Sequence, residues 1–387
     1  MRVPHLSCAV TACIVVLAFL LIGREVAVQL EHHTLPATAP EVFALKNQGT
    51  AFQRAVAETS NVLPLYGSSE LTMGPPSLRA AEFFSAEPAG FQVSPVGKPG
   101  VTSIIVLQKL AALGSELKGK KVAISLSPGW FLVPVVEPFM YRGNFSLFAA
   151  GQMAFGNSLD FQLKRDIASR MLEFPRTLAQ SPVLEFAIRR LASGKWPDRI
   201  AFAVAWPVGK LQNAILDLQD QFAAMIYILR QVRAPKPVTP QTLDWAGLIE
   251  KAASRNLPVE DERAENVEPQ LVPRGGDAGF LARLEATHEW ADLEMLLRVL
   301  GEIHARPILL SMPLDGRFYD QAGVSGAARE AYYAKIRALA ERYNVPLVEF
   351  KAHDGDPDFL DEHHYHLTAK GWLFYDRALA DFYSQPE

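Results

Sequence analysis

Cysteine is almost absent from this sequence. Its two cysteines, Cys8 and Cys13, both fall in an apolar segment near the N-terminus. The rest of the chain has none, which excludes a disulfide and a thiolate metal site there. A domain without cysteine is compatible with an oxidising compartment.

The sequence also lacks a block of basic residues. Lys and Arg number 38 against 42 Asp and Glu, and the formal net charge is −4. Because phosphate binding needs clustered Lys and Arg, we do not expect nucleic acid as a partner. The 387 residues, of which 49% are apolar, suit one large domain or a core domain with insertions.

Charge is missing altogether from residues 6–23, which are mainly Ala, Val, Leu, Ile and Phe. A helix of this length spans roughly 27 Å, enough to cross a bilayer. Arg2 precedes it, which favours a cytoplasmic N-terminus. A cleaved signal peptide is the alternative, but Arg24 follows directly and residues 27–29 make a poor cleavage site.

We therefore expect a single-pass protein of the cell membrane with the rest of the chain outside the cytoplasm. The predicted division is a cytoplasmic N-terminus (1–5), a transmembrane signal anchor (6–23), a stalk (24–50) and an extracytoplasmic domain (51–387) with a helical insertion at about 140–305.

Strand and helix patterns alternate along the extracytoplasmic part. The apolar residues 63–66 and 121–126 each run into small or polar residues, as buried strands do at their carboxyl ends. Between them, residues 102–118 form an apolar helical pattern with Thr102 or Ser103 as N-cap. Further strands are expected at 307–313 and 345–350. This alternation predicts an α/β fold, a parallel sheet between two helical layers.

The helical insertion carries two amphipathic patterns. Residues 282–304 predict one long helix. A second apolar stripe is most simply core packing, and a membrane-surface or partner-binding face is the alternative. Its residues are Leu211, Ile215, Leu218, Phe222, Met225, Ile226 and Leu229.

A candidate nucleophile follows the first strand of this domain. Gly67 can take the backbone angles of a sharp turn, and Ser69 just after it can present its hydroxyl to solvent. In open α/β sheets, ligands bind at this carboxyl edge. An ordinary Ser-rich turn is the alternative, since short motifs recur by chance.

The C-terminal part holds a dense run of acidic residues and histidines. A zinc site is one interpretation, although the run lacks the spacing of His-Glu-x-x-His, and a solvated loop is another. In the third interpretation an imidazole takes the proton of Ser69 and a carboxylate fixes its tautomer. The run comprises Asp361, Glu362, His363, His364 and His366.

Two blocks resemble those of the SGNH (GDSL-type) hydrolases. Gly67-Ser68-Ser69 is similar to their Gly-Asp-Ser block, with Ser69 at the place of the nucleophile. Their last block has a small polar residue two after the catalytic His, then a Gly and an aromatic residue. His366, Thr368, Gly371 and Trp372 fit that frame. We expect a helix to begin just after the loop with Thr368 as N-cap, and the base of the SGNH pattern, two residues before that cap, is then His366.

The chain resembles the DltD family more closely. That family has an N-terminal anchor followed by short motifs that occur here in the same order over nearly the whole chain. They are Gly67-Ser68-Ser69-Glu70, Gly97-Lys98-Pro99-Gly100, Ser127-Pro128-Gly129-Trp130-Phe131, and His366-Leu367 with Gly371-Trp372.

The resemblance implies an acyltransferase or esterase that acts in D-alanylation of teichoic acid or a related cell-envelope polymer. It implies a membrane-bound O-acyltransferase as partner and, indirectly, an acyl carrier protein. The chemistry needs no metal or organic cofactor. Two alternatives remain: a polysaccharide O-acetyltransferase or esterase with the same triad, and a non-catalytic adaptor for the acyltransferase and its carrier.

The resemblance also assigns residues. Ser69 is the expected nucleophile, His366 the base and Asp361 the carboxylate. The spacing Asp-x-x-His instead fits His364, which is the alternative base. SGNH enzymes use an Asn after the third strand as an oxyanion donor, where Gly129 offers only a backbone N–H. The candidate oxyanion and substrate residues are therefore Gly97, Gly100, Ser127, Gly129 and Trp130.

Overall fold

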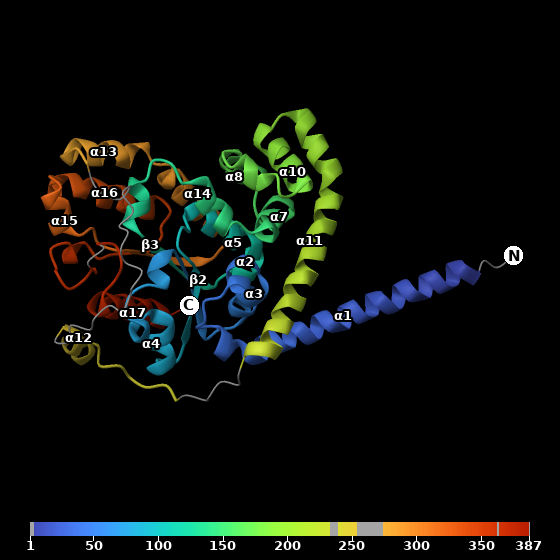
Figure 1. Cartoon of the computed structure of the whole chain (residues 1–387), viewed down its shortest axis with the longest axis horizontal. Coiled ribbons are helices and arrows are strands. Elements are labelled where there is room, and N and C mark those ends of the chain that lie inside the picture. Colours follow the sequence, from blue (N-terminus) through green and yellow to red (C-terminus); the bar gives the residue numbers. More distant parts are fainter. Residues whose placement is uncertain (1–3, 233–238, 254–273, 362–363, 387) are drawn as a thin grey trace.

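A five-stranded parallel sheet forms the centre of the domain that follows the N-terminal helix (Figure 1). The computed structural model describes residues 4–232, 239–253, 274–361 and 364–386. The strand order is β2-β1-β3-β4-β5, and every neighbouring pair is parallel. The predicted α/β class is thus confirmed. The strands are β1 (Val62–Gly67), β2 (Gln92–Gly97), β3 (Lys121–Leu126), β4 (Arg306–Ser311) and β5 (Leu347–Glu349).

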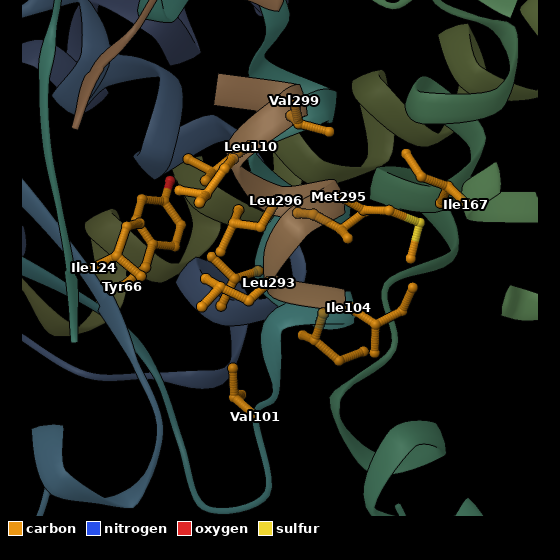
Figure 2. Packing of buried hydrophobic residues seen from close by; sticks show 14 of the residues in the cluster. Tyr66, Val101, Ile104, Leu110, Ile124, Ile167, Leu293, Met295, Leu296 and Val299 are labelled. Carbon is orange, nitrogen blue, oxygen red and sulfur yellow. The ribbon is translucent and has the colours of Figure 1, made fainter. Parts of the chain in front are cut away.

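Side chains alternate between two cores, one on each face of the sheet. In β3, Val122 and Ile124 join the first core while Ala123 joins the second, as the period of a strand requires. Figure 2 shows the first core. Tyr66 and Ile124 of the sheet lie next to Leu110 and Leu296, which come from the helices that cover this face. The first layer includes α5 (Ser103–Leu113), α14 (Glu289–Glu302) and α16 (Gly326–Arg342), and the second includes α4 (Ala80–Ala86) and α17 (Ala369–Ser384).

Helices dominate the chain between β3 and β4. The expected helix at 282–304 is wrong as a single element, because it is broken into α13 and α14. Thr287 is extended and ends the first, and its hydroxyl accepts a hydrogen bond from the Glu289 N–H at the start of the second. The helices here are α6 (Pro138–Asn144), α7 (Leu147–Phe155), α8 (Phe161–Met171), α9 (Pro175–Leu178), α10 (Pro182–Ser193), α11 (Trp196–Gln231), α12 (Trp245–Ala253) and α13 (Gly276–Ala286), before α14.

The N-terminal helix α1 is longer than the sequence pattern suggests. It runs unbroken over Pro4–Thr38, and among the described residues it is the helix long and apolar enough to cross a membrane. It projects from the body of the molecule (Figure 1), and residues 5–19 are all exposed.

The stalk expected over residues 24–50 differs from what the structure shows. These residues continue α1 and then form α2 (Ala44–Gln48). They pack on the domain because their apolar side chains are complementary to it: Leu35 lies in a small core with Ala55 of α3 (Ala51–Glu58) and Val62 of β1.

The remaining described elements are short. They are α15 (Gly316–Gln321) and the 3₁₀ turns η1 (Ser69–Leu71), η2 (Pro76–Leu78), η3 (Gly114–Leu117), η4 (Pro128–Leu132) and η5 (Lys351–His353).

Candidate active site

The candidate site lies at the carboxyl edge of β1 and β2, where two glycines are paired. Gly67 and Gly97 face each other in register. A Cβ on Gly97 would lie 2.1 Å from the carbonyl oxygen of Gly67, and one on Gly67 would lie 2.4 Å from Oε1 of Glu70. Neither glycine has a positive φ. Space, and not the turn angle we expected, is what requires glycine at Gly67.

Ser69 begins the turn η1 directly after β1, and His366 reaches it from the other end of the chain. Nε2 of His366 lies 3.1 Å from Oγ of Ser69. Nδ1 of the same ring lies 3.4 Å from Oδ2 of Asp361. His366 and Asp361 are both buried. The structure therefore brings the three residues into the order hydroxyl, imidazole, carboxylate, which is the arrangement that can activate a serine.

A narrow loop holds Asp361 and His366 side by side. Leu360 and Leu367 form an antiparallel bridge, and the Asp361 N–H donates to the carbonyl oxygen of His366 at 2.9 Å. In return the His366 N–H donates to Oδ1 of Asp361 at 3.4 Å. The carboxylate thus contacts both the backbone and the ring of His366, which restricts the orientation of the ring.

The helix after this loop begins where the sequence predicts. Thr368 is the N-cap of α17, and its side chain accepts a hydrogen bond from the Gly371 N–H at 3.3 Å. The predicted cap is confirmed. His366 is therefore on the chain that enters α17, two residues before the cap.

His364 is not brought to Ser69. Its backbone has a φ of +68°, and its ring stacks on Phe318 with 4.2 Å between the ring centroids. Nδ1 lies 2.8 Å from Oδ2 of Asp315. The alternative base thus forms a separate imidazole–carboxylate pair beside α15.

The residues on either side of Ser69 support the turn. Glu70 is buried, and its Oε1 accepts a hydrogen bond from the Ser68 N–H at 2.8 Å. Burial raises the pKa of Glu70, and the Ser68 N–H opposes that shift. Oγ of Ser68 accepts a hydrogen bond from Nε1 of Trp130 at 3.3 Å. Glu70 belongs to the quoted motif Gly67-Ser68-Ser69-Glu70, but the sequence analysis gave it no role. Its position next to Ser69 was the signal that could have pointed to it.

Ser69 and His366 open into a pocket of about 530 Å³. Four of the five expected oxyanion and substrate residues line it. The fifth, Gly97, is paired with Gly67 at the end of β2 and is not part of the lining. The sequence assigned no role to the other lining residues, which come from α6, from the quoted motif at 97–100 and from loops outside any quoted motif. These unpredicted lining residues are Met73, Lys98, Pro99, Phe139, Met140, Gly143, Asn144 and Tyr365.

The loop after β2 is tied to α6 across the pocket. Nζ of Lys98 donates to the Gly143 carbonyl oxygen at 2.7 Å, and Nδ2 of Asn144 donates to the carbonyl oxygens of Pro99 and Met140 at 3.2 and 3.0 Å. Gly100 has a φ of +86°, a conformation that favours glycine. The Asn144 amide is thus engaged in holding this loop, and the oxyanion donors stay a prediction.

The described part of this loop does not form a metal site. Within the described ranges, no group of three His, Cys, Asp or Glu side chains gathers as a metal site would require. Glu362 and His363, which belong to the zinc interpretation, lie outside those ranges.

Comparison with known proteins gives a consistent result. The model of one family, described as DltD protein, matches residues 39–384. The chain is 26% identical to Protein DltD of Bacillus subtilis (strain 168), over 95% of this chain and 96% of that one. It is 23% identical to Protein DltD of Staphylococcus aureus (strain NCTC 8325 / PS 47), over 86% and 84%, and 22% identical to Protein DltD of Lacticaseibacillus rhamnosus, over 89% and 86%.

Proposed function

This chain belongs to the DltD family, and on that premise we propose that it is a serine-dependent acyltransferase or esterase of the SGNH type. Its proposed role is the transfer of D-alanyl groups in D-alanylation of teichoic acid or a related cell-envelope polymer. The observation that carries the proposal is the 3.1 Å approach of His366 Nε2 to Ser69 Oγ in an open pocket.

The proposed reaction has two halves. In the first, Nε2 of His366 takes the proton of Ser69 while Oγ bonds to the acyl carbonyl carbon of an ester or thioester donor. The bond to the leaving group breaks, and the leaving group takes the proton from His366. In the second half, an acceptor hydroxyl gives its proton to His366 and attacks the acyl-serine, which restores Ser69. Water in place of the acceptor makes the same site an esterase.

Asp361 supports both halves through His366. Its Oδ2 lies beside Nδ1, so it favours the tautomer in which Nδ1 carries the proton and Nε2 is free to accept one. It also stabilises the imidazolium that forms when the proton of Ser69 arrives. In a buried position this attraction is stronger than in water.

The proposed site of action is the outer surface of the cell membrane. The uncharged run at 6–23 falls in the exposed part of α1, which supports a single-pass anchor with residues 1–5 in the cytoplasm and 51–387 outside. From the family resemblance, the proposed partners are a membrane-bound O-acyltransferase, an acyl carrier acting indirectly, and the polymer that accepts the acyl group.

Intact-mass spectrometry of the purified full-length protein tests the proposed chemistry. After incubation with a D-alanyl thioester donor, we expect an acyl adduct on Ser69, because the hydroxyl is positioned for attack. Ser69→Ala removes that adduct, whereas the matched neighbour Ser68→Ala retains it. A protein that supports D-alanylation equally well with Ala at position 69 is an adaptor and overturns the catalytic proposal.

N-terminal sequencing of the membrane fraction tests the anchor separately. We expect the full-length chain there with its N-terminus intact. A soluble mature protein starting near residue 30 contradicts the signal anchor without bearing on the triad.

A further inference from the structure

The helix α11 (Trp196–Gln231) presents its apolar side to solvent. Apolar residues recur every three or four positions along it, and at 100° per residue they fall within roughly 120° of its circumference. Trp196 and Val204 are each 74% exposed and Leu211 is 63% exposed. The exposed members of this face, which we call the α11 apolar face, are Trp196, Ile200, Val204, Val208, Leu211, Ile215, Ile226 and Leu229.

The residues of α11 that are fully buried against the domain are mostly small or polar, while Phe202 and Trp206 are partly buried against the first core. The fully buried residues are Gly209, Asn213, Gln221, Ala224 and Ile228. A helix that only faces a protein core buries its apolar stripe, whereas this apolar stripe of α11 is exposed. Core packing, the simplest interpretation of this stripe from the sequence, therefore does not account for the exposed residues.

The membrane anchor leaves the domain beside the C-terminal part of this face. A Cβ on Gly23 of α1 would lie 3.0 Å from Cζ of Phe222, which shares the α11 apolar face between Ile215 and Ile226. Nε of Arg24 lies 3.7 Å from Oδ2 of Asp217. Figure 1 shows that α11 runs along the side of the domain from which α1 projects.

The position of the bilayer surface follows from the length of the uncharged run. Residues 6–23 give a helix of roughly 27 Å, so the whole run is needed to cross a hydrocarbon core of about 30 Å. The run ends at Gly23, the residue that touches α11. No spacer separates the span from α11, and an apolar face beside the point of exit must therefore meet the headgroup and acyl boundary.

We propose that the α11 apolar face lies on the outer surface of the lipid bilayer as an interfacial helix. The inference rests on the proposed anchor. An uncharged face with Trp at one end is typical of helices that bury their apolar side a few ångströms into the boundary region. Charged residues of α11 such as Arg199, Lys210 and Asp217 point to its other sides. Together, α1 and α11 would fix the orientation of the domain above the membrane.

Depth-dependent fluorescence quenching on the full-length protein tests this proposal. Cys8 and Cys13 are replaced by Ser, so that one introduced cysteine carries an environment-sensitive fluorophore. Three labelled variants are compared: Val204→Cys on the α11 apolar face, Arg199→Cys on another side of the same helix, and Phe19→Cys within the span. Each is reconstituted into vesicles of phosphatidylglycerol and phosphatidylcholine, with and without bromine on the phosphatidylcholine acyl chains.

We expect brominated lipid to reduce the emission at Val204→Cys and Phe19→Cys by about twofold or more and to leave Arg199→Cys nearly unchanged. If Phe19→Cys is quenched while Val204→Cys behaves like Arg199→Cys, the inference is overturned and the anchor stands, and the face is left to a protein partner. If Phe19→Cys is not quenched, the anchor itself fails, and the inference fails with it.

A charged double variant gives a second readout. Val204→Asp with Leu211→Asp places charge on exposed positions, so the fold is retained. A label at Ile215→Cys should then lose its quenching by brominated lipid, while a label at Phe19→Cys keeps it. Unchanged quenching at Ile215→Cys would show that the contact does not depend on the apolar face.

Discussion

Two imidazole–carboxylate pairs lie within the loop that enters α17 and the helix beside it. One is His366 with Asp361, at 3.4 Å, and the other is His364 with Asp315, at 2.8 Å. By the distance to the carboxylate alone, the second pair is the better one. Yet only His366 has its other ring nitrogen within hydrogen-bond distance of Ser69. The two histidines therefore differ in the group that lies next to Nε2. The distance between Nδ1 and its carboxylate does not distinguish the candidate base.

The backbone at His364 explains why the two rings point differently. In an extended chain, residues two apart point to the same side, and both histidines would have faced the pocket. The φ of +68° at His364 interrupts that alternation. Its ring then packs on Phe318 of α15. One residue in the left-handed region thus separates a structural histidine from one that faces the pocket.

The largest effect is expected from breaking the contact that distinguishes the two pairs. Ser69→Ala and His366→Ala should each lower the rate of acyl transfer by on the order of 10⁴–10⁶-fold, and to a similar extent, because members of a triad act as a unit. Steady-state and single-turnover kinetics measure this, with thermal unfolding as a control for folding. A His366→Ala variant that retains most activity while His364→Ala loses it would reverse the assignment.

The two carboxylates offer a matched test with a smaller effect. Asp361→Ala should lower the rate by roughly 10²–10⁴-fold, since His366 loses the group that orients its ring. Asp315→Ala should leave the rate within about threefold of wild type and lower the free energy of unfolding by about 1 kcal/mol, because Oδ1 of Asp315 accepts hydrogen bonds from the Arg317 and Phe318 N–H groups at the start of α15. Equal losses of activity in both variants would contradict this.

A milder effect is expected at Ser68, which does not contact His366. Ser68→Ala removes the acceptor of the Trp130 indole N–H, and Trp130 lines the pocket. One lost neutral hydrogen bond corresponds to about 1 kcal/mol, so we expect kcat/KM to fall by no more than about tenfold. A loss as large as that of Ser69→Ala would show that the nucleophile is Ser68.

The smallest effect is expected at His364. Its side chain is 30% exposed, and its pair with Asp315 lies beside the pocket without lining it. His364→Ala should change kcat/KM by less than about threefold, in line with the small contribution of partly exposed ion pairs. The same assay measures it, and His366→Ala in parallel provides the contrast.

The sequence predicted those parts of the fold and site that depend on local pattern. The strand that ends at Gly67 and the N-cap at Thr368 each depend on residues that are adjacent in the sequence. The edge of the sheet and the start of α17 could therefore be predicted. The choice between His364 and His366 was made from spacing relative to that cap. The distance to Ser69 agrees with it, and the catalytic role stays a prediction until the variants are made.

What escaped prediction depends on contacts between distant segments. From the sequence, residues 24–50 look like a stalk. In the structure Leu35 packs against residues of α3 and β1, and no local sequence pattern shows that long-range contact. We therefore do not expect a protease to release the domain by cutting within residues 24–38, since these residues are helical and packed. Likewise, the exposure of the α11 stripe could not be read from its period, which is the same for a helix facing a core and one facing lipid.

The separation of Ser69 and His366 along the chain has a consequence for biosynthesis. They are 297 residues apart, and His366 directly precedes α17. During synthesis and export, the nucleophile therefore leaves the ribosome long before its base. A nascent or truncated chain can carry an assembled β1 edge but no activated serine. On the proposed mechanism, a chain that has not yet delivered His366 cannot hydrolyse acyl donors, and loss of α17 should abolish the activity in a single step.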